Sequence, residues 1–251
     1  MSAGIGVPND MGVDEAAIKA AISNIRDRRA GGEPAVQTVS RPVVVKSHQK
    51  APAVIPQVTL RQAQIWSTPA GMLTSSGDYA ENSIYTNWAK IKLSESEDVS
   101  NARADVAFYF YYYNWQKDNI AVLSAVTTQI SARGDVTAFA PKGKSSAALS
   151  ATFNVYTPPA AVTFPNSAPA VDLGSVNAGG NSEHKTLILT GSSPRMLSLP
   201  DNVDIEPGNY ALFEVIMQVN YDIAGGSISL DFASGDFEVT CPNVSCGLLS
   251  G

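Results

Sequence analysis

The sequence predicts an all-β protein: an antiparallel, jelly-roll-like β-sandwich preceded by an N-terminal arm with one short helix. From residue 58 onward, long segments of alternating apolar and polar residues are separated by polar turns, with no helical pattern between them. Before residue 58, one helical repeat is followed by a proline-rich connector. We therefore expect an arm over residues 1–57 and one sandwich domain over residues 58–251. The proline- and glycine-rich segment 158–181 leaves two smaller sandwiches as the alternative.

The first expected element is a helix over about residues 13–29. Asp10 is positioned to cap it, Glu15 falls in its first turn, and Gly31 and Gly32 end it. A helix of about four turns with one narrow apolar stripe is not stable alone. We therefore expect the stripe to dock on the chain's own body, on a neighbouring copy or on a partner. The residues expected to make this contact are Val13, Ile18, Ile22 and Ile25.

A proline-rich connector follows the helix over residues 31–57. Its four prolines preclude a helix and favour extended chain, and they are Pro34, Pro42, Pro52 and Pro56. A fully extended chain of this length reaches up to ~90 Å. The connector therefore allows the helix to lie on the body or far from it.

Eleven segments of the body have the residue pattern of β-strands. Strand 209–221 alternates most clearly, and the glycine pair that separates it from strand 226–234 predicts a hairpin. A second hairpin is expected between strands 103–115 and 119–132, and residues 133–135 are expected to turn into the next strand. The expected strands are residues 58–67, 83–94, 103–115, 119–132, 134–140, 146–157, 185–191, 194–199, 209–221, 226–234 and 236–241.

The most unusual segment is the aromatic run FYFYYYNW at residues 108–115. Aromatic rings that face solvent stack on sugars or bases, and tyrosine hydroxyls add hydrogen bonds. A strand buried on both sides explains the same run, because aromatic residues readily fill β cores. An intermolecular contact is the third interpretation. The candidate carbohydrate-binding platform consists of Tyr109, Tyr111, Tyr113 and Trp115.

Acidic residues gather in two places along the body. Asp201, Asp204 and Glu206 form the first group, and the acidic residues between Asp222 and Glu238 form the second. Calcium prefers loop carboxylates and carbonyl oxygens, so calcium binding is one interpretation of either group, and the first group supplies the candidate ligands. The alternative is a solvated loop, since neither group has the ligand spacing of an EF-hand. No other cofactor is expected.

The sequence carries no motif of a known catalytic site. It has only two histidines, His48 and His184, and neither a G-x-S-x-G elbow nor a phosphate-binding glycine motif. Cys241 and Cys246 stand five positions apart, and they are expected to be either a disulfide across a turn or buried thiols. We therefore expect a protein that is not an enzyme. A carboxylate pair for glycoside hydrolysis is the remaining catalytic alternative.

Charge separates the arm from the body. The formal net charge is −6, and only 16% of residues are charged. Residues 1–55 hold seven Lys and Arg against five Asp and Glu, whereas residues 56–251 hold ten against eighteen. The acidic body does not suit nucleic acid, whose phosphates require clustered basic residues. No export signal and no membrane-spanning apolar run is visible, so a cytoplasmic protein or a virion-like particle is expected.

The helix, the long connector and the lack of catalytic motifs together predict a non-catalytic structural protein. We expect it to form homo-oligomers, with its arm docked on a neighbouring subunit or a partner. In its layout of arm followed by sandwich, the chain resembles the single jelly-roll coat proteins of small icosahedral viruses, which implies self-assembly. The resemblance lies in architecture alone, and this arm is less basic than those that package RNA. The alternative is a carbohydrate- or cell-surface-binding sandwich, lectin-like or toxin-like, that uses the aromatic strand.

Overall fold

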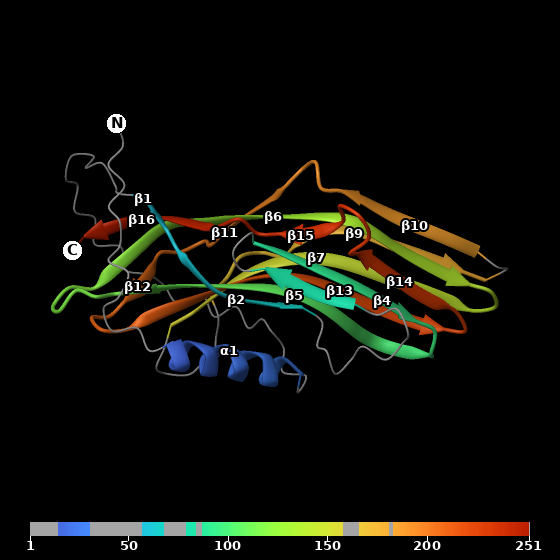
Figure 1. The fold of residues 1–251 in the computed structure, drawn as a ribbon, viewed down its shortest axis with the longest axis horizontal. Coiled ribbons are helices and arrows are strands. Elements are labelled where there is room, and N and C mark those ends of the chain that lie inside the picture. Colours follow the sequence, from blue (N-terminus) through green and yellow to red (C-terminus); the bar gives the residue numbers. More distant parts are fainter. Residues whose placement is uncertain are drawn as a thin grey trace.

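The structure is a computed structural model, and it describes residues 15–30, 57–67, 79–83, 87–157, 166–180 and 183–250. These residues form a two-layer β-sandwich with helix α1 (Glu15–Ala30) on the outside of one layer (Figure 1). The predicted all-β sandwich and the predicted short N-terminal helix are confirmed. Asp10, Val13 and almost all of the connector lie outside the described residues.

Two antiparallel sheets form the layers. Sheet I has the order β1 (Gln57–Thr59), β16 (Val244–Ser250), β6 (Ala121–Ala140), β14 (Ser227–Phe232), β4 (Trp88–Glu95) and β15 (Glu238–Thr240). On it, β10 (Glu183–Thr190), β11 (Arg195–Ser198) and β12 (Val203–Ile205) pair with β6, and β3 (Tyr79–Ser83) pairs with β4. Sheet II has the order β2 (Arg61–Ser67), β5 (Val99–Tyr113), β13 (Tyr210–Ala224), β7 (Lys144–Tyr156) and β8 (Asn166–Ser167), with β9 (Val171–Gly179) paired to β7.

Consecutive long strands alternate between the two sheets. The chain passes from β4 in sheet I to β5 in sheet II, back to β6 and again to β7. As a result, the order β4-β14-β6-β10 in sheet I faces the order β5-β13-β7-β9 in sheet II. Eight antiparallel strands arranged in this way form a jelly roll. The predicted jelly-roll-like architecture is therefore confirmed.

The predicted hairpin of strands 209–221 and 226–234 is wrong. Both strands exist, but β13 pairs with β5 and β7 in sheet II, whereas β14 pairs with β4 and β6 in sheet I. Gly226 allows this crossing, because a Cβ there would lie 2.3 Å from the carbonyl oxygen of Phe139. The other predicted hairpin is wrong for the same reason, since β5 and β6 lie in different sheets. Alternation identifies the face that a strand buries, not its neighbour.

The predicted turn at residues 133–135 is also wrong, because β6 continues through it for 20 residues. The first half of β6 pairs with β11, β12 and β16, and the second half pairs with β10, β14 and β15. A Cβ at Gly134 would lie 2.4 Å from the carbonyl oxygen of Asp231 and 2.5 Å from the ring of Phe232. Gly134 therefore permits close packing within the strand and makes no turn.

Two further segments differ from their predictions. The strand expected over residues 58–67 divides at Leu60 into β1 of sheet I and β2 of sheet II, so the chain changes layers there. The buried Leu60 donates its N–H to the carbonyl of Val244 at 2.9 Å. Segment 158–181 lies outside the expected strands, but its described part contains β8 and β9. The small and polar residues of β9 conceal a strand that β7 holds through backbone pairing.

A large hydrophobic cluster fills the space between the sheets. Phe108, Phe110, Phe153 and Phe213 are almost fully buried in it, and the ring centroids of Phe153 and Phe213 are 6.2 Å apart. These four rings come from β5, β7 and β13, which are neighbours in sheet II. The inward face of these strands therefore belongs to the core, and their outward face remains for other contacts.

We expect Gly134→Ala to lower the free energy of unfolding by about 1–3 kcal/mol, because the added methyl group overpacks against β14. Urea denaturation followed by circular dichroism measures this change. Gly179→Ala is the matched control, since no described residue beyond its chain neighbours has an atom within 4 Å of its Cβ position. It should change stability by less than about 0.5 kcal/mol. Equal stability of the two variants would contradict the packing role of Gly134.

Candidate functional site

The aromatic strand β5 divides its rings between two environments. Side chains alternate across a strand, so Phe108, Phe110 and Tyr112 enter the sandwich core. Tyr109 and Tyr111 point to the outer face of sheet II, yet they are only 0% and 7% exposed. Two members of the candidate platform therefore present no ring face to solvent in this structure.

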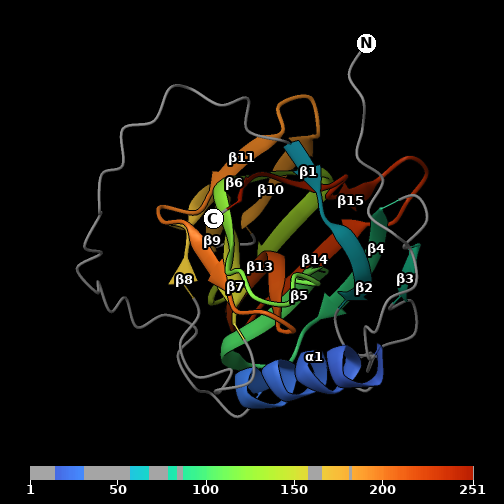
Figure 2. The ribbon, with the colours of Figure 1, turned by 90° about the vertical axis from the view of Figure 1, so that its left-hand side faces the viewer.

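Helix α1 covers these outward rings. Its stripe residues Ile18, Ile22 and Ile25 are buried against the outer face of sheet II. Figures 1 and 2 show the helix lying along this side of the sandwich. The sheet residues in the contact are Ala107, Tyr109, Tyr111, Tyr156, Leu212 and Ile216. The stripe was expected to dock on the chain's own body, on a neighbouring copy or on a partner. In the structure it docks on the chain's own body.

A buried polar cluster lies within this contact. Glu214 is fully buried and accepts hydrogen bonds from the hydroxyl of Tyr109 at 2.7 Å and from that of Tyr156 at 2.9 Å. The Nδ2 atom of Asn154 donates a third bond at 2.8 Å, and Ser167 in turn donates to Asn154 Oδ1 at 2.7 Å. Such a network holds several side chains in one arrangement, because a buried carboxylate needs its donors.

Glu214 and Asn154 were not predicted from the sequence as members of a site. The alternation in this strand predicts that Glu214 shares a face with Gln218 and Asn220, and the structure agrees. Helix α1 covers only the end of that face at Glu214. One signal in the sequence was available. The outward positions Leu212 and Ile216 are apolar, which interrupts the polar side of the strand and indicates a second buried surface there.

The other two members of the platform lie at the end of β5. Tyr113 is half-buried, and Trp115 is 55% exposed in the loop between β5 and β6. The fully buried Asn114 holds this loop, because its Nδ2 donates to the carbonyls of Asn119 and Ile205, each at 2.8 Å. The structure therefore presents Trp115 on a fixed loop, apart from the two covered tyrosines.

The candidate calcium residues lie near the same end of the sandwich. Asp201, Asp204 and Glu206 are exposed, and Asp204 sits on β12, opposite Val122 of β6. Within the described ranges, no three His, Cys, Asp or Glu side chains are grouped closely enough to hold a metal ion.

The second acidic group is partly engaged in an ion pair on sheet I. Asp231 lies 3.0 Å from Lys92 Nζ and opposite Asp135 in the strand register. Burial by itself would raise the pKa of Asp231, but hydrogen bonds from Ser234, the Ala233 amide and Lys92 lower it to about 2. Burial and the neighbouring Asp231 carboxylate raise the pKa of Asp135. The ion pair between Lys92 and Asp231 ties β4 to β14.

The cysteines and the described histidine stand apart from this face. Cys241 and Cys246 are buried free thiols, and burial raises the pKa of each to about 12. Cys241 Sγ lies 3.4 Å from the hydroxyl of Thr128, which belongs to the core side of sheet I. His184 is exposed on β10 beside Phe139, with ring centroids 6.2 Å apart. His48 lies outside the described residues.

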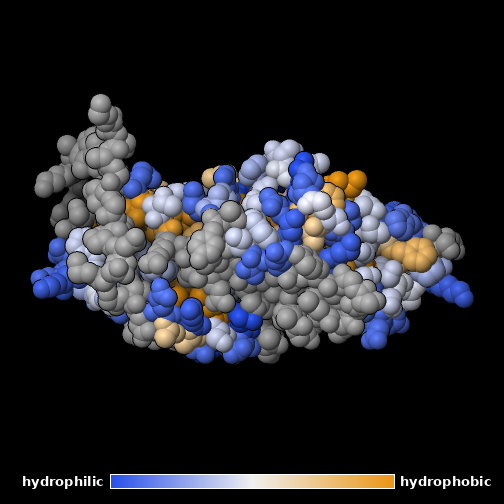
Figure 3. All heavy atoms as spheres, viewed as in Figure 1, coloured by the Kyte–Doolittle hydropathy of each residue, from blue (hydrophilic) through white to orange (hydrophobic). Residues whose placement is uncertain are grey.

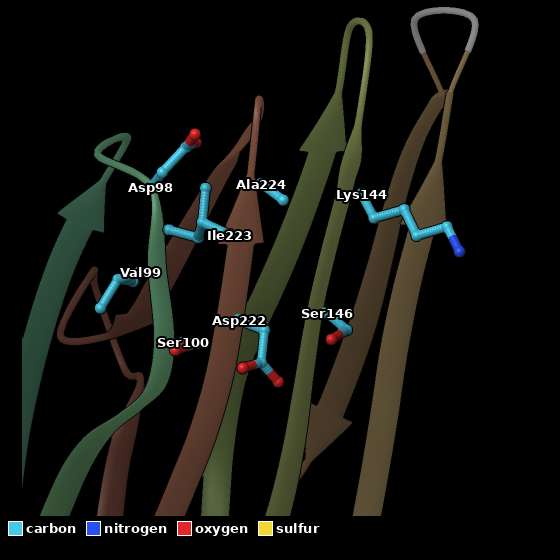
Figure 4. A pocket seen from close by; sticks show the side chains of 8 residues that line it. All are labelled: Asp98, Val99, Ser100, Lys144, Ser146, Asp222, Ile223 and Ala224. Carbon is cyan, nitrogen blue, oxygen red and sulfur yellow. The ribbon is translucent and has the colours of Figure 1, made fainter.

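The outer face of sheet II continues beyond the helix as a polar surface with a hollow at its far end. The hollow has a volume of about 480 Å³ and is lined by Asp98–Ser100, Lys144, Ser146 and Asp222–Ala224. Figure 4 shows Asp222 and Ser146 side by side on β13 and β7, with Lys144 extending away from them. In the view of Figure 3, hydrophilic side chains dominate the described surface, and hydrophobic ones form small separate patches.

No protein-family model and no curated protein matches this sequence. Among solved structures, the chain is similar to the carbohydrate-binding module TmCBM27, described for specific mannan recognition, at 12% identity and a TM-score of 0.21 over 76% of this chain and 96% of that chain. It is also similar to TmCBM61 in complex with β-1,4-galactotriose, at 10% identity and a TM-score of 0.18 over 74% and 87%. Likenesses this weak carry no argument about ligand or activity. In the part of the chain that the structure describes, no helix has the length and apolar character needed to span a membrane.

We expect Tyr109→Phe to lower the free energy of unfolding by about 1–3 kcal/mol, because Glu214 loses a buried charge-assisted hydrogen bond. Thermal or urea denaturation of the full chain measures the loss. Tyr113→Phe is the matched control on the same strand, since the Tyr113 hydroxyl bonds to no described residue, and it should change stability by less than about 0.5 kcal/mol. A neutral Tyr109→Phe would contradict the structural role of this network.

Proposed function

We propose that this chain is a non-catalytic structural subunit that assembles with copies of itself, and that α1 and the face beneath it form the assembly contact. The observation that supports this is the fit between the isoleucine stripe and the apolar half of sheet II. A short amphipathic helix is not stable without such a surface. Jelly rolls are the fold of viral capsid subunits, so the body suits a structural role.

The length of chain between the helix and the body supports docking on a neighbouring copy. Residues 31–56 separate α1 from β1, and 26 residues span at most ~90 Å. The longest strand, β6, has 20 residues and is therefore roughly 66 Å long. A helix on this tether can reach the equivalent face of an adjacent subunit. There it would make the same contacts that it makes with the face of its own subunit. Exchange of an identical element is a low-cost route to oligomers.

We expect the full-length protein to elute as an oligomer in size-exclusion chromatography with light scattering, and Ile22→Glu to convert it to a monomer. Ile22 is 1% exposed, so a carboxylate at this position removes the helix from its face. Circular dichroism should show that the β-sandwich of the variant is retained, because the inward core is unchanged.

Ser23→Glu is the matched control. Ser23 is exposed on the same helix, so a glutamate there adds the same charge without entering the contact with the sheet. It should remain oligomeric. A wild-type protein that is monomeric at high concentration would rule out self-assembly. An Ile22→Glu variant that stays oligomeric would leave assembly in place but assign it to another surface.

A second candidate function is carbohydrate binding without catalysis. The observation that favours it is the half of the outer face of sheet II that α1 leaves uncovered, where hydrogen-bonding side chains adjoin the hollow. Jelly rolls are also the fold of lectin domains. The exposed Trp115 is a second place where a sugar ring would stack.

We expect the full-length protein to retain at least one neutral oligosaccharide on a glycan array, because sugars offer hydroxyl groups in pairs that amides and carboxylates bind. Binding should persist at 0.5–1 M salt, roughly, since screening weakens charge–charge attraction and leaves neutral hydrogen bonding in place. An array on which the protein retains no glycan would exclude this second candidate and would leave the assembly proposal untouched.

A further inference from the structure

The uncovered half of the outer face of sheet II is built from successive cross-strand rows. Residues directly opposite each other in adjacent strands share a face, so the pairing register places their side chains together. One row joins Asp105 of β5, Gln218 of β13 and Ser150 of β7. The next row begins with Arg103 and Asn220, and the last contains Asp222 and Ser146. Strand β9 extends the rows with polar residues.

Hydrogen bonds hold the polar side chains of these rows in place. Gln218 Nε2 donates to Asn220 Oδ1 at 2.6 Å, and Arg103 Nε donates to Asp105 Oδ1 at 2.6 Å. Asp222 Oδ1 accepts the N–H of Asn101 at 2.8 Å. Within the described chain, these bonds leave Oε1 of Gln218 and Nδ2 of Asn220 for a ligand. Fixed side chains lose little entropy on binding, which favours recognition.

The polar rows end at an open hollow, whose lining also includes the apolar Val99 and Ile223. Its volume of about 480 Å³ lies within the range of roughly 300–1,000 Å³ that is usual for small-ligand sites. Asp222 and Ser146 belong both to the last row and to the lining of the hollow (Figure 4). The rows and the hollow therefore form one continuous surface that crosses the strands.

The chemistry of this surface excludes two other classes of ligand. Asp105 is buried and pairs with Arg103, so the exposed charges of this surface are Asp98, Asp172 and Asp222 against Lys144. This surplus of carboxylates repels the phosphates of nucleic acid. Ala148 is the apolar member of the rows, and Val99 and Ile223 line the hollow. Among these described residues there is no aromatic or Met side chain of the kind that anchors protein interfaces.

We infer that the uncovered half of this face, from Gln218 and Asn220 to the hollow at Asp222, binds a neutral saccharide chain laid across the strands. The inference rests on the second candidate function and names its site. It assigns recognition to amide and carboxylate groups, and it assigns the tyrosines beneath α1 to helix docking. Assembly through α1 and saccharide binding here use different halves of one sheet face and are independent.

The test is isothermal titration of the full chain with the neutral oligosaccharide that gives the strongest array signal. Asn220→Ala and Gln218→Ala should each weaken binding at least tenfold, with unchanged melting temperature, because both side chains lie outside the core. Asn202→Ala is the matched control on an exposed loop at the other end, and it should bind like the wild-type protein.

The variant Trp115→Ala distinguishes saccharide binding at these rows from saccharide binding at the loop that follows β5. Unchanged binding by Trp115→Ala, with loss in the two amide variants, is the expected result. Loss in Trp115→Ala together with wild-type affinity in Asn220→Ala and Gln218→Ala would overturn the inference while carbohydrate binding stands. A protein that retains no array oligosaccharide would remove the second candidate function and this site with it.

Discussion

The pairing of β13 with β5 on one side and β7 on the other is the constraint on which the rest of the structure depends. At one end of these three strands, both faces of the sheet must be covered. Phe110 and Phe213 face the sandwich core, while Tyr109 and Glu214 face outward from the same strands. The outward carboxylate and rings need a cover that excludes water. Helix α1 supplies it, so the arm and the body are parts of a single hydrophobic and hydrogen-bonding arrangement.

The same sheet face therefore has two chemistries along the length of β13. Near Leu212 and Ile216 it is apolar, and it accommodates a helix whose isoleucines have no other described surface to bury against. Near Gln218 and Asn220 it is polar and open. The boundary falls within one strand, so a single rigid β element positions both a docking surface for a helix and a hydrogen-bonding surface.

Sequence patterns predicted the faces of the strands well and their neighbours poorly. The alternation in residues 209–221 places Phe213 and Val215 inward, as observed, yet the partner of β13 is β5 and not the next strand in the chain. Gly134 and Gly226 have the residue type of turns, but in the structure they admit a ring and a carbonyl oxygen at close range. A glycine in the sequence therefore does not distinguish a turn from a position where another atom packs closely against the backbone.

The sequence by itself determined the β-sandwich class, the short helix and its isoleucine stripe, because these follow from residue periodicity along a continuous segment. Only the tertiary structure decided that Tyr109 and Tyr111 lie under α1, that Glu214 joins Tyr156 and Asn154, and that Trp115 is exposed on a loop held by Asn114. The hydrogen bonds to Glu214 join residues that lie from 58 to 105 positions apart. Local periodicity carries no information on contacts at that separation, since they depend on the order in which strands alternate between the two sheets.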